Sequence, residues 1–153
     1  MKDMTILHNG IIYLDGLKLF PKFSIQNDLA FVPGSLSKDG YWGFWGNLKY
    51  LITDKSPITV LKQPFHVTVC FQEDRLQYIE LIPIIDDEGL TDAEAEERRR
   101  EVCDKWLSKY IGEPDSKIPL ESVYSFSWGG IKSYSIMAGK YKNKGGRIVL
   151  TYK

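Results

Sequence analysis

The sequence predicts an α+β domain, in which an antiparallel sheet of about six or seven strands packs against one long helix at about 91–111. Three observations predict this class. Aromatic residues, which pack well on pleated surfaces, make up 13% of the chain. Alternating apolar residues and turn dipeptides recur on both sides of a central segment. That central segment alone shows sustained helical periodicity.

The chain is expected to form a single domain, 1–153, because 153 residues leave little room for two cores. A chain of about 150 residues buries roughly 68–70% of its unfolded surface, so it needs no metal or disulfide to fold. The two cysteines, Cys70 and Cys103, match neither a disulfide framework nor a zinc pattern. We therefore expect no metal and no cofactor.

The first strands are predicted in "TILHNGIIYLDGLKLFP", where Asn9-Gly10 and Asp15-Gly16 suit tight hairpin turns. Ser24 is placed to cap a short helical turn over Ile25–Leu29. The clearest hairpin joins "FHVTVCF" to "RLQYIELIPI". In its return strand the apolar residues fall on both faces, with Leu76, Tyr78 and Ile82 on one side and Ile79 and Leu81 on the other, so this strand should be central.

The stretch "GYWGFWGNLKY", residues 40–50, combines aromatic rings with three evenly spaced glycines. A glycine inside a strand often marks a bulge, so we expect a bent strand with a bulge near Gly43. In a regular strand Trp42 and Trp45 would lie on opposite faces. We expect these rings chiefly to pack in the core or on the sheet. Contact of Trp42 or Trp45 with a protein partner is one alternative, and stacking on sugars or bases is another.

The helix begins at a capping box, Thr91-Asp92-Ala93-Glu94, and ends near Gly112 and Pro114. One apolar stripe predicts the face that packs on the sheet, namely Val102, Cys103, Trp106, Leu107, Tyr110 and Ile111. The first half, "AEAEERRRE", has nothing large to bury and is expected to project along the surface or into solvent. The remaining chain predicts a last hairpin, with one strand at about 124–138 and a final strand at 147–152 that could pair with another chain by its edge.

Net charge is zero, from 20 basic and 20 acidic residues, which argues against a general affinity for nucleic acid. The distribution is uneven, however. Acidic residues gather between 86 and 101, and the acidic face with Glu94, Glu97 and Glu101 is the first candidate for protein contact, since such charge steers association with a basic partner. In the Lys-rich C-terminal loop the candidates for anion binding are Lys140, Lys142, Lys144 and Arg147.

No catalytic residue is predicted. His66 and Cys70 share a strand face, but the strand rise separates their Cα atoms by roughly 13 Å, too far for a nucleophile and its base. The acids between 86 and 97 lack the spacing of a calcium loop and suit the start of a helix. There is no run of 18 apolar residues and no convincing signal peptide, so we expect a cytoplasmic protein without a membrane segment.

The segments "KWLSKYIGEP", "FSWGGIKSY" and "GGRIVLTYK" resemble those of a loose group of short, uncharacterised bacterial α+β proteins. The resemblance covers roughly the second half of the chain. Some similar small cytosolic bacterial proteins are immunity proteins, which bind and block a toxin made next door. The resemblance therefore implies a non-enzymatic protein-binding module of the immunity type. The alternative is a small-ligand binder or enzyme with a pocket between the sheet and the aromatic segment.

Overall fold

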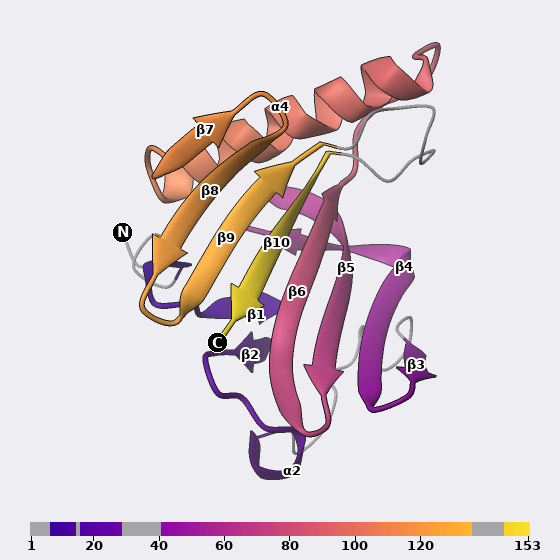
Figure 1. Cartoon of the computed structure of the whole chain (residues 1–153). Helices are drawn as coiled ribbons and strands as arrows, with labels where there is room; N and C mark the ends of the chain where they lie inside the picture. The colour runs from indigo at the N-terminus through magenta and orange to yellow at the C-terminus, as the bar shows by residue number, and fades with distance from the viewer. Residues whose placement is uncertain (1–6, 15, 29–40, 136–145) are drawn as a thin grey trace.

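The computed structural model describes residues 7–14, 16–28, 41–135 and 146–153, without the side chains at 41, 45 and 53–56. It confirms an α+β fold with an antiparallel sheet and one long helix (Figure 1). Eight strands form the main sheet in the order β3-β4-β5-β6-β10-β9-β8-β7. Two further strands, β1 and β2, form a separate hairpin, so the described strands outnumber the six or seven expected.

The N-terminal elements are β1 (Ile12–Leu14), β2 (Leu17–Leu19) and α2 (Ile25–Asp28). The main sheet and its helix comprise β3 (Tyr41–Trp45), β4 (Leu48–Val60), β5 (Gln63–Gln72), β6 (Arg75–Pro83), α4 (Asp92–Tyr110), β7 (Ser116–Ile118), β8 (Glu121–Phe126), β9 (Gly129–Tyr134) and β10 (Arg147–Tyr152). β1 and β2 pair as a hairpin from Ile12 opposite Leu19 to Leu14 opposite Leu17, and the Ser24-capped turn forms where the sequence predicts it. Residues 7 and 8 are helical, so the strand expected before Asn9-Gly10 is wrong over its described part.

The strand expected at 124–138 is in fact two strands, β8 and β9, because the chain reverses at Ser127-Trp128. Gly129 makes this turn possible. It has φ of 153°, and a Cβ added there would lie 1.9 Å from the carbonyl oxygen of Thr151. Glycine is therefore the residue that fits so close a backbone approach.

One face of the sheet, the inner face, carries the core. Helix α4 covers one end of it and the β1–β2 hairpin covers the other (Figure 1). The buried aromatic residues also satisfy backbone carbonyls at these contacts. Trp106 Nε1 donates to Val60 O at 3.1 Å, and the Tyr152 hydroxyl donates to Gly10 O at 2.9 Å. These bonds tie the helix and the N-terminal segment to the sheet.

The last strand, β10, lies in the middle of the sheet. It pairs with β6 on one side and with β9 on the other. The expectation that an exposed final strand could add to another chain is therefore wrong. The strands at the two ends of the sheet are β3 and β7. Sequence could not order them because the pairing of β10 with β6 joins segments separated by the whole helix.

The faces of β6 also differ from the prediction. The ladder between β5 and β6 shifts after the pair Cys70–Tyr78, so that Phe71 pairs with Leu76. Gln77 is the extra residue of this bulge, and it reverses the side-chain alternation. Leu76 consequently joins Ile79 and Leu81 in the core, whereas Tyr78 lies half-buried on the opposite face.

The aromatic strand β3 is regular where we expect a bulge. All five of its residues pair with β4 in one register, from Tyr41 opposite Ile52 to Trp45 opposite Leu48. The turn follows at Gly46, which has φ of 60°. The side chain of Trp42 packs against Phe71 in the core, with ring centroids 6.0 Å apart. The bulge near Gly43 is thus wrong, and the irregularity of this region lies in β4, between Thr53 and Ile58.

Helix α4 starts as predicted. The Thr91 hydroxyl accepts from the Glu94 amide at 3.1 Å, and Glu94 accepts from the Thr91 amide at 3.0 Å. It ends before Gly112, whose φ is 102°. The expectation that its first half projects into solvent is wrong in part, because Ala95, Glu96, Arg99 and Arg100 are buried.

Candidate functional site

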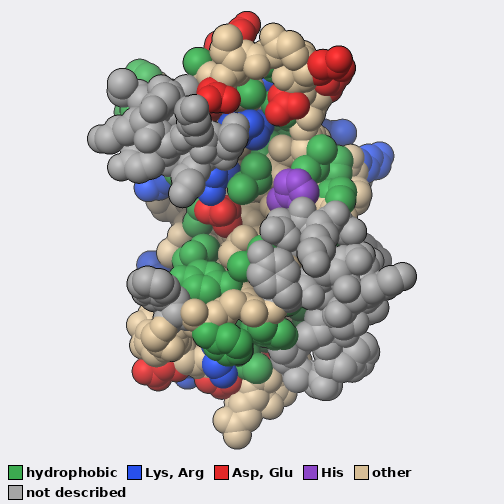
Figure 2. Space-filling view, turned by 90° about the vertical axis from the view of Figure 1, so that its right-hand side faces the viewer, with side chains coloured by type: hydrophobic (Ala, Val, Ile, Leu, Met, Phe, Trp, Pro, Cys, Tyr) green, Lys and Arg blue, Asp and Glu red, His purple; other side chains and the backbone are tan. Residues whose placement is uncertain are grey.

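A strongly acidic surface lies at the start of α4 and in the loop before it. We call it the acidic ridge, and its exposed carboxylates are Asp86, Asp87, Glu88, Asp92, Glu94, Glu97 and Glu101. Figure 2 shows acidic side chains gathered at the upper end of the molecule. Of the three predicted contact residues in this region, Glu94 also completes the helix cap, whereas Glu97 and Glu101 are free of that role.

The three consecutive arginines of α4 do not neutralise the ridge equally. Arg98 is exposed and donates to the carbonyl oxygen of Asp86 at 3.5 Å. Arg99 and Arg100 are buried, at 7% and 8% exposure. Seven exposed carboxylates therefore face one exposed guanidinium between residues 86 and 101. The surface is more negative than the composition of the segment indicates.

Arg100 points inward because the neighbouring elements offer it acceptors. Its Nε donates to both carboxylate oxygens of Asp104, at 3.2 and 3.1 Å. Its Nη2 donates to the Ser122 hydroxyl on β8 at 3.1 Å, and its Nη1 lies 3.4 Å from Pro119 O. A guanidinium held by a carboxylate and several neutral acceptors can be buried at acceptable free energy.

The opposite face of the sheet, the outer face, carries a mixture of polar and apolar side chains. A row across four strands contains Thr68, Glu80, Val149 and Lys132. Arg147 Nη1 lies 2.9 Å from Glu80 Oε1, and Arg147 is only 9% exposed. Arg147 is thus an internal ion-pair partner, which argues against its predicted role in anion binding. Lys140, Lys142 and Lys144 lie outside the described residues.

Both cysteines are buried and lack the surroundings of a nucleophile. Burial raises the pKa of the Cys70 thiol, although hydrogen bonds to Tyr78 and Tyr50 act in the opposite direction. Burial likewise raises the pKa of Cys103, which lies in the apolar interface of α4. A raised pKa keeps a thiol protonated and unreactive. The structural role that the sequence suggests for both cysteines fits these surroundings.

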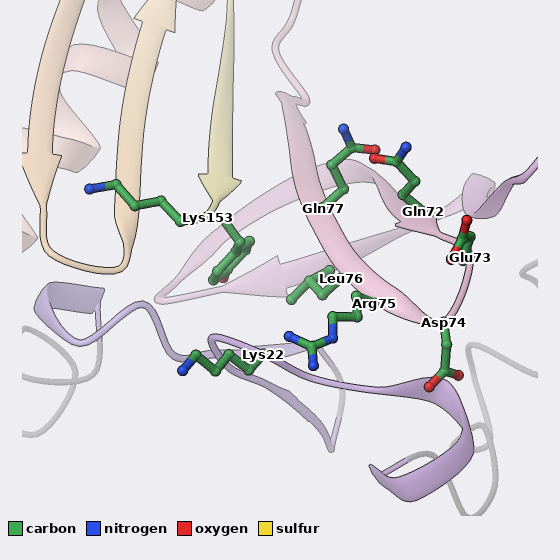
Figure 3. A pocket seen from close by; sticks show the side chains of 9 residues that line it. Lys22, Gln72, Glu73, Asp74, Arg75, Leu76, Gln77 and Lys153 are labelled. Carbon is green, nitrogen blue, oxygen red and sulfur yellow. The ribbon is translucent and has the colours of Figure 1, made fainter.

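A cleft of about 550 Å³ opens at the other end of the molecule from the ridge, beside the turn between β5 and β6. Its lining residues include Lys22, Arg75, Leu76 and Lys153 (Figure 3). Nearby, Asp74 accepts bonds from the Ser24 hydroxyl and the Gln26 amide. The first of these bonds is the main reason that the pKa of Asp74 is lowered.

Sequence reasoning missed this cleft because its parts are far apart in the chain. Lys22 precedes α2, whereas Arg75 starts β6. They meet because Ser24 pairs with Arg75 in an isolated bridge, and the Leu76 amide donates to Phe23 O at 2.9 Å. No local pattern predicts such a pairing, although the turn "QED" before Arg75 is apparent in the sequence.

Of the two aromatic candidates for protein contact, Trp42 and Trp45, the structure describes the side chain of Trp42. Trp42 is partly buried and contributes to the core, so little of its ring is available to a partner. The side chain of Trp45 lies outside the described residues. Phe44, which the sequence does not single out, is 69% exposed. Among the described side chains of β3, it is therefore the aromatic one that is exposed to solvent.

Comparison of the chain with protein-family models, curated proteins and solved structures found no match. Among the described residues, no group of three or more His, Cys, Asp or Glu side chains is arranged to hold a metal ion. Over the same residues, no helix is long and apolar enough to cross a membrane.

Proposed function

We propose that this protein is a non-enzymatic binding module and that the acidic ridge contacts a partner with a basic surface. The observation that carries the proposal is the burial of Arg99 and Arg100, which leaves Arg98 as the exposed arginine of the triplet beside the seven exposed carboxylates of α4 and its preceding loop. Concentrated surface charge of one sign speeds association with an oppositely charged protein and selects against other partners.

The rigidity of the ridge supports the same function. Its helix is capped at Thr91 and anchored to β8 through Arg100 and Ser122. Glu97 and Glu101 lie four residues apart, so they occupy one side of that helix. A surface held in place before binding loses little conformational entropy when the complex forms.

The finer proposal is that the partner is a basic toxin and that the module blocks it, as an immunity protein does. The resemblance of the second half of the chain to small bacterial proteins motivates this step. A toxin that acts on nucleic acid carries a basic substrate site, and an acidic ridge is complementary to such a site. Cells that express the product of a neighbouring toxin gene should survive only when this protein is also present.

The binding proposal is tested by affinity capture from an extract of the native host. The ridge variant is Glu97→Gln with Glu101→Gln, which keeps the Glu94 cap intact. The control is Glu73→Gln with Glu113→Gln, which removes two exposed carboxylates elsewhere. We expect the wild type and the control to retain one protein in stoichiometric amount and the ridge variant to retain much less of it.

A salt titration of the captured complex completes the test. Capture through the ridge should weaken as ionic strength rises, because exposed charges are screened within about 8–10 Å at physiological salt. Retention that is equal for the ridge variant and the control would contradict the proposed contact surface. Failure to recover any stoichiometric protein would contradict the proposed function.

A further inference from the structure

The cleft beside the turn between β5 and β6 holds two positive side chains on facing segments. Arg75 reaches from the start of β6 toward the segment before α2 that carries Lys22, whereas the ammonium groups of Lys22 and Lys153 both point away from the Arg75 guanidinium (Figure 3). The backbone bridge between Ser24 and Arg75 fixes this proximity. The fold therefore places both residues in the lining of one cleft.

Two carboxylates, those of Glu73 and Asp74, also line the cleft. Asp74 is bound by the Ser24 hydroxyl and the Gln26 amide and acts on Arg75 only through its field. Within the described residues, neither Lys22 nor Arg75 forms a salt bridge. Two cations that line one cleft without a salt-bridge partner are both available to a bound anion, which each would attract.

The backbone at Lys22 adds a second observation. Its φ is 67°, a left-handed conformation that asparagine and glycine adopt more readily than lysine. Residues held in such conformations are concentrated at ligand sites. Asparagine would adopt this backbone conformation with less strain. The backbone alone therefore does not account for a lysine at position 22.

We propose that this cleft binds a small organic oxyanion, carrying a phosphate or carboxylate group, between Lys22 and Arg75. The planar guanidinium of Arg75 can donate two parallel hydrogen bonds to either group, and the Lys22 ammonium supplies a further donor and charge. Leu76 offers an apolar wall for the carbon skeleton, and Gln72 and Gln77 provide amides at the rim. The site is separate from the acidic ridge and does not depend on the proposed protein partner.

The test is a titration of the full chain with pyrophosphate and, separately, with citrate, followed by amide chemical shifts. We expect saturable shifts at residues 22–24 and 73–77, with a Kd of about 1 mM or tighter for at least one probe. Stronger binding of pyrophosphate would assign a phosphorylated ligand, and stronger binding of citrate would assign a carboxylated one.

Three variants decide whether the binding is specific. Arg75→Gln and Lys22→Asn should each weaken the binding at least about fivefold, because each removes a charged donor. Arg98→Gln removes an exposed arginine outside the cleft and should leave the affinity unchanged. All three positions are exposed, and circular dichroism will show that the variants fold. Absence of saturable shifts at about 10 mM probe, or equal weakening by Arg98→Gln, would overturn the proposal.

Discussion

Arg100 on α4 donates a hydrogen bond from Nη2 to the hydroxyl of Ser122 on β8, at 3.1 Å. This contact joins the long helix to the sheet through a buried cation. It also explains why the arginine triplet fails to neutralise the surface of the acidic ridge. Arg100 therefore affects both the stability of the fold and the charge of the acidic ridge.

Replacement of Arg100 by alanine should destabilise the protein by about 2–4 kcal/mol, because Asp104 and Ser122 would lose their charged partner in a buried site. Arg100→Lys should recover little of this loss, since an ammonium cannot reproduce the fork of the guanidinium. Urea denaturation measures the change. Arg98→Ala is the control and should alter stability by less than about 0.5 kcal/mol. Equal effects of the two alanine variants would contradict the internal role of Arg100.

The turn between β8 and β9 should not tolerate a side chain at Gly129. A Cβ there would overlap the carbonyl oxygen of Thr151 at 1.9 Å, so Gly129→Ala must displace β10. We expect a loss of at least about 3 kcal/mol, or failure to fold. Gly46→Ala also places alanine at positive φ, 60°, but no atom lies within 4 Å. It should cost only about 1 kcal/mol, and thermal unfolding will separate the two variants.

The two aromatic residues that flank Gly43 in β3, Trp42 and Phe44, should differ in how much they contribute to stability. Trp42→Ala removes a ring that packs on Phe71 and should lower stability by about 1.5–3 kcal/mol. Phe44→Ala removes a side chain that is 69% exposed and should change stability by less than about 0.5 kcal/mol. Denaturant midpoints give both values. A large loss for Phe44→Ala would mean that its ring is covered.

The hydrogen bond from the Ser24 hydroxyl to Asp74 predicts a pH dependence of the stability of the protein. Hydrogen bonds, chiefly from Ser24, hold the pKa of folded Asp74 below its ordinary value of 3.8. Its contribution to stability is therefore fully present above about 3.8 and is lost as pH falls through the lower folded pKa. The stability difference between wild type and Asp74→Asn should be constant from neutral pH down to about 3.8 and shrink at lower pH. A stability difference that stays unchanged down to the lowest pH at which the protein folds would contradict this hydrogen bond.

Local signals in the sequence predict the helix well and the sheet only in part. The capping box at Thr91 and the stop at Gly112 depend on neighbours in the chain, and both form as expected. The central place of β10 and the bulge at Gln77 depend on strands that are distant in sequence. Pairing register of that kind is set by packing across the sheet, which no local pattern records.

The same distinction holds for the candidate sites. The acidic residues of the ridge are adjacent in sequence, so their exposure could be predicted. The burial of Arg100 could not, because its acceptors beyond Asp104 include groups on β8 and the segment before it. The cleft with Lys22 and Arg75 requires a bridge between residues 24 and 75. Arg147 looked like a surface cation in the sequence, but its pairing with Glu80 places it inside.

The most direct test of the central claim compares affinity capture by the wild type, by Glu97→Gln with Glu101→Gln, and by Glu73→Gln with Glu113→Gln in one host extract. A contact at the acidic ridge predicts one stoichiometric protein with the wild type and with the second pair of changes. It also predicts a large, salt-dependent loss of captured protein with Glu97→Gln and Glu101→Gln, because this is the pair of carboxylates that lies on the ridge. Equal capture by all three proteins, or no captured protein at all, would contradict it.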